Sequence, residues 1–148
     1  MFKHILLPTD GSKLSAKAVK RGIAFAKSLK ARVTGIHVVP EFRMMVDEGY
    51  LLPGSATLRK RFEDESRERA KKVLEVIDKN ARNAGVKCET MCVVSDLPYE
   101  VIVKTAKKKK CDLVMMASHG RHGISGLLLG SETAKVLLHA TVPVLVVR

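Results

Sequence analysis

The sequence predicts an α/β fold, a single doubly wound domain in which a five-stranded parallel sheet carries helices on both faces. Two observations support this prediction. Short apolar runs rich in β-branched residues alternate along the chain with segments of helical periodicity, as βαβ units require. One run, Asp112–Ala117, is apolar at almost every position, which is typical of a strand buried on both faces of a parallel sheet. The length of 148 residues fits one domain with its own core.

The first half of the chain predicts two strands and two helices. Lys3–Thr9 is a short apolar run that ends in turn-forming residues, and Arg32–Val39 is a β-branched run. Between them, Ser12–Lys30 has apolar and small residues at spacings of three and four, which indicates an amphipathic helix. Pro40–Ala56 has no period, so we expect a lid or a partner-facing loop that becomes ordered with a ligand. Thr57–Ala84 is predicted to be a long amphipathic helix whose core stripe begins at Leu58.

The second half continues the alternation. We expect strands at Val86–Val94, Asp112–Ala117 and Val142–Val147. We also expect a helix that carries Pro98 in its first turn and runs to about Lys110, and a last helix at Ser131–Ala140. Asp96 is the predicted N-cap of the first of these helices. In an open sheet of this kind, ligands bind beyond the carboxyl ends of the strands, where the strand order reverses. The segments to examine for function are therefore Thr9–Ser12, Val38–Ala56 and Ser118–Ser131.

The charge balance favours an anionic partner. Lys and Arg number 27 against 15 Asp and Glu, which gives a net charge of +12. Proteins that bind single-stranded nucleic acid also use stacking aromatic residues, and this chain has only four Phe, two Tyr and no Trp. The Lys107–Lys110 run fits a solvated helix end. A nucleic-acid partner is therefore the less favoured interpretation.

The cellular setting is predicted from what the sequence lacks. No apolar run approaches the length that spans a bilayer, and the N-terminal residues do not resemble a signal peptide. Three cysteines, an odd number, argue against a disulfide framework and suggest small buried hydrophobic residues in a reducing cytosol. We expect a soluble, cytoplasmic protein without a membrane partner.

The glycine-rich segment after the fourth predicted strand is the most informative part of the sequence. It contains Gly120, Gly123, Gly126 and Gly130, which would let the backbone approach a ligand and adopt positive φ angles. Gly130 and Ser131 open a helix, whose free N–H groups suit a phosphate. The alternative is a flexible connection with Ser131 as an ordinary N-cap. Signatures of P-loop, dinucleotide-binding and esterase sites are absent from the sequence.

The spacing of Gly120, Gly130 and Ser131 resembles the nucleotide-binding motif of the universal stress protein family, with Ala117 in place of the first glycine of that motif. The segments Ile5–Ser12, Gly35–Val39 and Pro143–Val147 are also similar to the family, so the resemblance covers nearly the whole chain. It implies one such domain over residues 1–148 with a Rossmann-like sheet of order 3-2-1-4-5. It also implies a homodimer through the last strand.

The resemblance places this chain in the ATP-binding branch of the family, with ATP or AMP as the ligand and Mg²⁺ as an optional companion. Asp10 matches the residue near the ribose and adenine, and Val38 matches a backbone contact to the adenine edge. Taken from the residues alone, Asp10 is a turn residue, and Val38 is a core strand residue. We expect His119 to brace the phosphate loop, whereas His37 fits a hydrogen-bonded core histidine. The candidate nucleotide-binding residues are Pro8, Thr9, Asp10, Val38, Met116, Ala117, His119, Gly120, Arg121, Gly123, Gly130, Ser131 and Glu132.

The resemblance implies a cytosolic, nucleotide-dependent regulator of the stress response that acts on an unidentified protein partner. The sequence shows no nucleophile–base pair and no metal-ligand cluster, so a dedicated enzyme is disfavoured. Slow ATP hydrolysis or autophosphorylation at Ser118, Ser125 or Ser131 stays open. Two alternatives remain, a nucleotide-independent interaction module and a basic nucleic-acid-binding protein.

Overall fold

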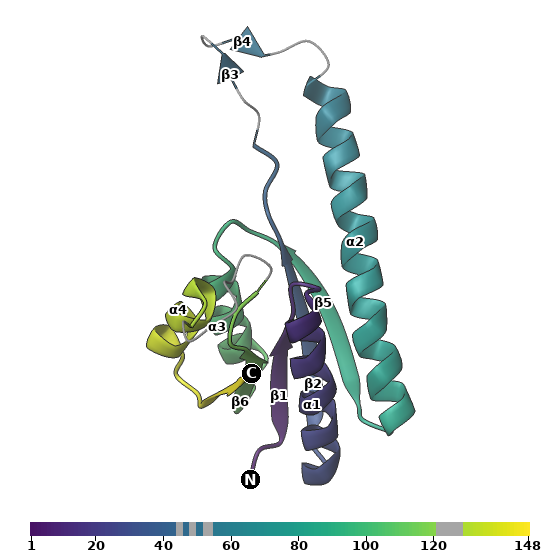
Figure 1. Ribbon diagram of the computed structural model, residues 1–148, viewed down its shortest axis with the longest axis vertical. Coiled ribbons are helices and arrows are strands. Elements are labelled where there is room, and N and C mark those ends of the chain that lie inside the picture. The colour runs from purple at the N-terminus through teal and green to yellow at the C-terminus, as the bar shows by residue number, and fades with distance from the viewer. Residues whose placement is uncertain (44–45, 48–49, 52–54, 121–128) are drawn as a thin grey trace.

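The computed structural model describes residues 1–43, 46–47, 50–51, 55–120 and 129–148 (Figure 1). The elements in chain order are β1 His4–Pro8, α1 Lys13–Leu29, β2 Arg32–Val39, β3 Val46–Asp47, β4 Tyr50–Leu51, α2 Ser55–Ala84, β5 Cys88–Val94, α3 Pro98–Lys108, β6 Leu113–Ala117, α4 Ser131–His139 and β7 Val144–Val147. No described helix is long and apolar enough to cross a membrane.

The main sheet has five strands in the order β5-β2-β1-β6-β7, and all four strand pairs are parallel. Numbered along the chain without the short β3–β4 pair, this order is 3-2-1-4-5, so the predicted fold class is confirmed. β1 lies at the centre, between β2 and β6. The chain leaves β1 for β2 on one side and later returns to β6 on the other, so the carboxyl ends of β1 and β6 form the switch point of the sheet.

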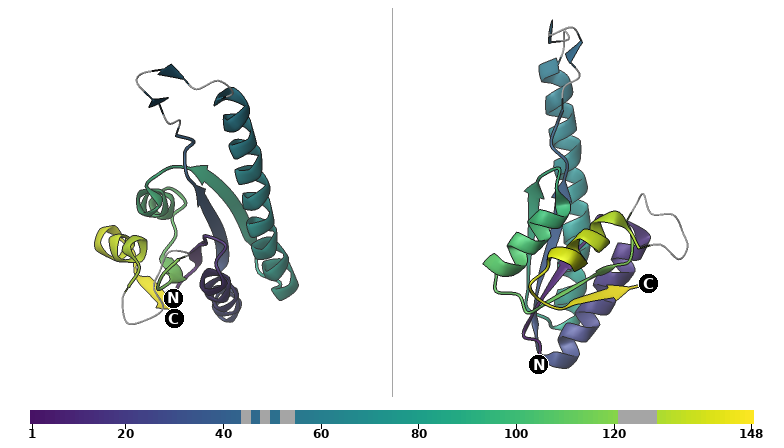
Figure 2. Two further views of the ribbon diagram at one scale, coloured as in Figure 1. Left: turned by 45° about the horizontal axis from the view of Figure 1, so that its top comes forward. Right: turned by 90° about the vertical axis from the view of Figure 1, so that its left-hand side faces the viewer.

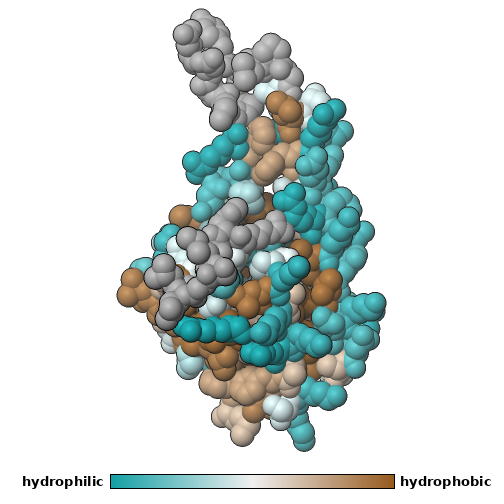
Figure 3. Space-filling view, viewed as in Figure 1, coloured by the Kyte–Doolittle hydropathy of each residue, from teal (hydrophilic) through white to brown (hydrophobic). Residues whose placement is uncertain are grey.

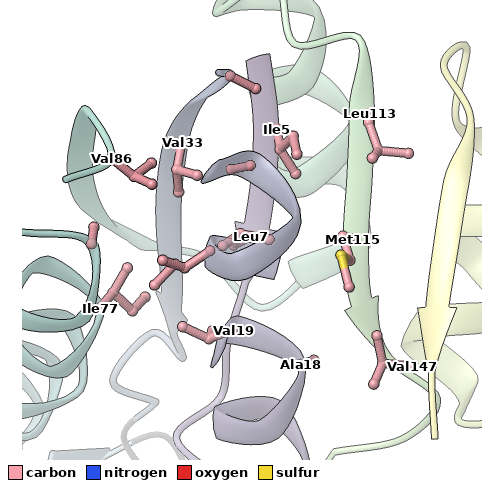
Figure 4. Close-up of a cluster of buried hydrophobic side chains, with 14 of the residues drawn as sticks. Ile5, Leu7, Ala18, Val19, Val33, Ile77, Val86, Leu113, Met115 and Val147 are labelled. Atoms are coloured by element: carbon pink, nitrogen blue, oxygen red, sulfur yellow. The ribbon is translucent and has the colours of Figure 1, made fainter. Parts of the chain in front are cut away.

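Two apolar layers enclose this sheet. Ile5 and Leu7 of β1 face α1 and α2, where they pack with Val19 and Ile77 (Figure 4). Leu6, between them in the sequence, faces α3 and α4 and belongs to a second core cluster. Successive side chains of a strand point to opposite faces, so a strand that is buried throughout, as β1 and β6 are, fits a sheet covered on both sides.

The helix boundaries agree with the predictions within a few residues, but one predicted cap is wrong. Ser12 caps α1, because its side chain accepts a hydrogen bond from the Ser15 N–H. Leu97, and not Asp96, is the N-cap of α3, and it makes no side-chain cap hydrogen bond. Gly130 caps α4, so Ser131 is its first helical residue.

The carboxylate of Asp96 binds the segment that follows β2 instead. It accepts hydrogen bonds from the Glu41 N–H at 3.0 Å and from the Arg43 Nε at 2.8 Å. These bonds lower the pKa of Asp96, with the Arg43 contact as the main cause. Asp96 therefore ties two connections at the carboxyl ends of β2 and β5, a role that local sequence does not reveal.

The segment Pro40–Ala56 also differs from its prediction. It contains the short antiparallel pair β3–β4, and α2 begins two residues earlier than predicted, at Ser55. The other residues between 43 and 55 lie outside the described ones. The first half of α2 extends past the end of the sheet (Figures 1 and 2). Leu58, which was predicted to be part of the core stripe of this helix, is therefore exposed.

The cysteines are free, as predicted, but they are not all buried. Cys111 is buried, Cys88 is half-buried and Cys92 is exposed on the edge strand β5. Burial raises the pKa of the Cys88 and Cys111 thiols to about 11. Both thiols therefore stay protonated at neutral pH and are poor nucleophiles.

Candidate functional site

A cavity of about 470 Å³ lies at the switch point, beyond the carboxyl ends of β1, β2 and β6. This volume is typical of a site for a small molecule. Its lining comes from six elements, β1, α1, β2, α3, β6 and α4, and from the connections that follow β1 and β6. The lining residues are Pro8, Thr9, Asp10, Ser15, Ile36, Val38, Pro98, Ile102, Met116, Ala117, His119, Gly120, Leu129, Gly130, Ser131, Glu132 and Thr133.

Every predicted site residue that the structure describes lines this one cavity. Arg121 and Gly123 lie outside the described residues. The predicted residues come from distant parts of the sequence, 8–10, 38, 116–120 and 130–132, and the parallel sheet brings them to one edge.

The turn after β1 holds Asp10 at the rim of the cavity. Its Oδ1 accepts a hydrogen bond from the Ser12 N–H at 2.9 Å. The Thr9 hydroxyl accepts from the Gly11 N–H at 3.1 Å and contacts the Ser15 hydroxyl at 3.0 Å. Gly11 has a φ of 79°, which favours glycine at this position. Asp10 thus has the turn role that its sequence context predicts, and its carboxylate also borders the cavity.

Gly120 and Gly130 are required for a reason other than the predicted one. Neither has a positive φ; that of Gly130 is −62°. A Cβ at position 120 would lie 3.3 Å from Asp10 Cγ and would overlap its carboxylate oxygen. A Cβ at position 130 would lie 2.9 Å from the Cα of His119. The two glycines therefore allow close approach within the protein itself.

The N–H groups available to a ligand come from the first turn of α4. The Gly130 N–H, which we predicted to face a phosphate, donates instead to the Ser118 carbonyl at 2.8 Å. The first hydrogen bond inside α4 runs from the Ala134 N–H to the Gly130 carbonyl, so the N–H groups of residues 131–133 have no partner within the helix. The Thr133 hydroxyl donates to the Ala117 carbonyl at 2.9 Å and seats this turn on the end of β6.

Glu132 borders the cavity, but its carboxylate serves the neighbouring helix. Its Oε2 accepts the Tyr99 N–H at 2.9 Å, at the start of α3, and its Oε1 forms an ion pair with Lys135. Because α3 lacks a side-chain cap of its own, Glu132 provides an acceptor for one free N–H group there. The contact also fixes α3 beside α4.

The backbone of Val38 is turned toward the cavity. The Thr9 N–H donates to the Ile36 carbonyl and the Ser95 N–H donates to the Val39 carbonyl, so alternate residues of β2 face β1 and β5. By this alternation the backbone N–H and C=O of Val38 face the β1 side. The pairing of β1 with β2, however, ends at Pro8 and Ile36. The N–H and C=O of Val38 therefore lie just past the end of the ladder.

The two histidines near the cavity are placed differently. His37 is buried, and its Nδ1 donates to the Thr9 carbonyl at 2.8 Å, as expected for a satisfied core histidine. Since a carbonyl can only accept, this contact places a proton on Nδ1. His119 lines the cavity, and its Nδ1 lies 3.2 Å from the Ser118 hydroxyl. The described residues contain no group of His, Cys, Asp and Glu that could hold a metal ion.

Sequence reasoning missed six lining residues: Ser15, Ile36, Pro98, Ile102, Leu129 and Thr133. Pro98 and Ile102 are one turn apart in α3, so helical periodicity places them on a common face. That this face meets the cavity depends on how α3 packs, which no local signal reveals. Together with Met116, the missed aliphatic residues give the cavity an apolar wall.

The comparisons with known proteins decide the family. A family model described as "Universal stress protein family" matches residues 1–148, the whole chain. The chain belongs to the universal stress protein family. Universal stress protein MJ0577 of Methanocaldococcus jannaschii is 39% identical, with 100% of this chain and 96% of MJ0577 aligned. Universal stress protein MJ0531 of the same organism is 36% identical, over 100% of this chain and 83% of MJ0531.

Solved structures of universal stress proteins agree. A structure of MJ0577 matches with a TM-score of 0.82 at 34% identity, over 99% of this chain and 96% of that one. A crystal structure of a universal stress protein in complex with cAMP matches with a TM-score of 0.68 at 26% identity, over 99% of this chain and 97% of that one. This universal stress protein therefore shares both its fold and its family with a nucleotide-bound relative.

Proposed function

We propose that this universal stress protein binds an adenine nucleotide in the cavity at the switch point of its sheet. One observation carries the proposal: a cavity of about 470 Å³ combines an apolar wall, an exposed strand backbone, a carboxylate and the N-terminus of a helix. These four features correspond to the base, the base edge, the ribose and the phosphate of a nucleotide. The relative in complex with cAMP supports this class of ligand.

The apolar wall of Ile36, Ile102 and Met116 suits the faces of a purine ring. The backbone of Val38 suits adenine in particular. A backbone C=O can accept from the exocyclic N6 amino group of adenine, and the adjacent N–H can donate to a ring nitrogen. Guanine carries a carbonyl oxygen where adenine carries its amino group. This oxygen and the Val38 carbonyl are both acceptors, so they could not form a hydrogen bond with each other.

The polar rim suits the ribose and the phosphate. Asp10, at the end of β1, can accept hydrogen bonds from ribose hydroxyl groups. The N–H groups of residues 131–133, which have no partner within α4, lie at the positive end of this helix, which favours an anion. The described lining contains no Lys or Arg, so the helix N-terminus is the main source of positive potential there. A bound triphosphate would gain from Mg²⁺ as a companion ion.

The cellular role follows from family membership. We infer that nucleotide occupancy changes how this protein engages an unidentified protein partner during a stress response in the cytoplasm. The cavity is bordered by the connections after β1 and β6 and by the starts of α3 and α4, so a ligand would contact four segments at once. A bound nucleotide would order these segments, and this ordering would change the surface that a partner contacts.

Isothermal titration calorimetry with AMP, ATP, cAMP and GMP tests the proposal. We expect the three adenine nucleotides to bind and GMP to bind at least tenfold more weakly, because the base edge is read by Val38. Equal binding of AMP and GMP would contradict the role of Val38. Failure of all four nucleotides to bind would favour a nucleotide-independent interaction module.

A further inference from the structure

The outer face of α1 carries several positively charged side chains and no negatively charged one. Lys13, Lys17, Lys20, Arg21 and Lys27 are all exposed, and we call these five residues the α1 stripe. The helix contains no Asp or Glu. With the C-cap Lys30 it holds six cations and no anion, so it carries +6 of the net +12. Half of the net charge of the chain therefore lies on this one helix and its C-cap.

The stripe lies on a single face because the opposite face of α1 is buried. Val19, Ile23 and Ala26 pack against the sheet in the main core cluster. From Lys13 to Lys27 the helix rises about 21 Å. In the view of Figure 1, hydrophilic residues cover most of the front over α2, whereas hydrophilic and hydrophobic residues mix over the lower centre of the molecule, where α1 lies (Figure 3).

The charges of the stripe are not compensated within the described residues. None of its five members forms an ion pair with them. Arg21 donates only a long hydrogen bond, of 3.4 Å, to the carbonyl of Arg148. Like charges spaced four residues apart on a helix, as Lys13, Lys17 and Arg21 are, repel one another. By contrast, α2 pairs Arg59 with Glu63 and Arg82 with Asp78.

We propose that the α1 stripe binds the phosphate backbone of a nucleic-acid duplex without reading its sequence. A duplex carries about one negative charge per 1.7 Å of axis, which matches a dense row of cations with no carboxylate among them. The residues between the cations, Ala16, Ala24 and Ser28, are small and exposed, so the helix can approach a backbone closely. These three small side chains cannot read base edges through several hydrogen bonds, so we expect no preference for a base sequence.

Other partners fit the stripe less well. A protein interface needs large apolar or aromatic anchors, and none of the large exposed hydrophobic residues belongs to α1. A membrane-bound helix needs an apolar face to insert, but the apolar face of α1 packs in the core. Single-stranded nucleic acid requires stacking aromatic residues, which the exposed face of α1 lacks. The scarcity of aromatic residues thus excludes single-strand stacking and leaves backbone binding to a duplex.

Fluorescence anisotropy with two labelled 20-base-pair duplexes of unrelated sequence, without added nucleotide, tests the proposal. Five phosphate contacts predict a slope of log K against log salt of about −4.5, or a loss of about 500-fold between 50 and 200 mM salt. The variant Lys17→Gln with Lys20→Gln removes two contacts and should reduce the slope to about −2.7. Both duplexes should bind equally.

The matched control is Lys60→Gln with Lys72→Gln, which removes the same charge from exposed positions on α2. It should retain the wild-type slope. No duplex binding at 50 mM salt, or equal losses in the two double variants, would overturn the proposal. Binding of the protein to vesicles of anionic lipid, but not to duplexes, would also overturn the proposal. Because no stripe residue lines the cavity, the outcome is independent of whether the cavity binds a nucleotide.

Discussion

Asp10 and Gly120 follow different strands, yet they touch at the rim of the cavity. The Asp10 carboxylate occupies the space that a side chain at position 120 would need. Gly130 lies in the same way against the backbone of His119, and its N–H closes the loop onto the Ser118 carbonyl. These close approaches bring the end of β6 and the start of α4 against the end of β1. Single side chains here therefore control the shape of the whole site.

Substituting Gly130 with valine should impair both the site and the fold. A branched side chain would collide with the His119 backbone, 2.9 Å from where its Cβ must sit, and would shift the first turn of α4. Overpacking of this kind costs about 1–3 kcal/mol of stability, and the loss of charge-assisted phosphate contacts should lower AMP affinity at least tenfold. Calorimetry and thermal denaturation measure the two effects.

Gly85→Ala serves as the control for this substitution. Gly85 has a φ of +71° and nothing within 4 Å of its missing Cβ, so alanine there strains the backbone without filling the cavity. It should lower stability by about 1 kcal/mol and leave AMP affinity unchanged. Equal AMP affinities for wild type and Gly130→Val would move the nucleotide site elsewhere.

Asp10→Asn isolates the charge of the carboxylate. The amide oxygen can still accept the Ser12 N–H, so the turn after β1 should survive. Ribose hydroxyl groups would lose a charged acceptor, and AMP affinity should fall about tenfold with little change in melting temperature. Calorimetry and thermal denaturation check this expectation. An unchanged affinity would show that Asp10 forms the turn and does not contact the ligand.

At the residue scale, most residues that line the cavity could be predicted, because the polar and glycine residues among them follow strand ends. The predicted reason for Gly120 and Gly130 was wrong, since their neighbours Asp10 and His119 belong to contacts that form only in the folded chain. The same is true of Glu132, whose partner, the Tyr99 N–H, is 33 residues away. Residue types could be predicted, but their contacts could not.

At the scale of elements, a polar chain that runs from the buried His4 and Thr34 to Glu89 at the surface joins β1, β2 and β5. His4 Nε2 lies 2.7 Å from the Thr34 hydroxyl, which donates to Glu89 at 2.9 Å. Lys109 forms an ion pair with the other oxygen of Glu89, and its carbonyl contacts His4 Nδ1. This chain lies near the amino ends of the strands and includes no residue that lines the cavity. It fixes three strands on the side where no ligand is expected.

Acidification should lower the stability of the fold, because a proton on His4 adds a charge at a buried position. Burial, with a smaller contribution from the Arg32 charge, lowers the pKa of His4 below its ordinary value of 6.5. A base whose folded pKa is depressed adds stability above its unfolded pKa and loses it as the pH falls. The free energy of unfolding, measured in urea, should therefore decrease from pH 7 to pH 5, and less so in His4→Gln. An equal decrease in both proteins would contradict this role of His4.

The elements themselves were largely predictable, but their terminal details were not. Alternating apolar runs located the five main strands because each is buried by helices on one or both faces. The cap of α3 was misassigned because Asp96 binds Glu41 and Arg43, which are more than 50 residues away in sequence. Leu58 was predicted to lie in the core but is exposed. Helical periodicity cannot show that α2 extends past the end of the sheet.

At the scale of the whole molecule, β7 leaves one edge of the sheet open. It is the last strand in the order β5-β2-β1-β6-β7, and its sequence is apolar throughout. Leu145 on this strand and Leu138 on the preceding helix are exposed, by 37% and 79%. An apolar edge with unpaired backbone groups favours association. We propose that two copies pair through β7, in agreement with the expectation from the sequence.

Val146→Lys should weaken this dimer. A charged side chain on the paired edge would repel its symmetry mate, because a two-fold axis places the same residue on both sides. Light scattering after size exclusion should give a dimer for the wild type at micromolar concentration and a larger monomer fraction for the variant. AMP affinity should be retained, which shows that the variant is folded. A monomeric wild type at that concentration would exclude pairing through β7.

The central claim, an adenine-nucleotide site at the switch point, is tested most directly by backbone amide NMR spectra recorded during titration with AMP. We predict saturable shifts of the Val38 amide and of the amides of residues 131–133, which border the cavity. The amides of Lys3 and His4, at the opposite end of the sheet, should not move. An absence of shifts, or shifts centred on the opposite end, would contradict the claim.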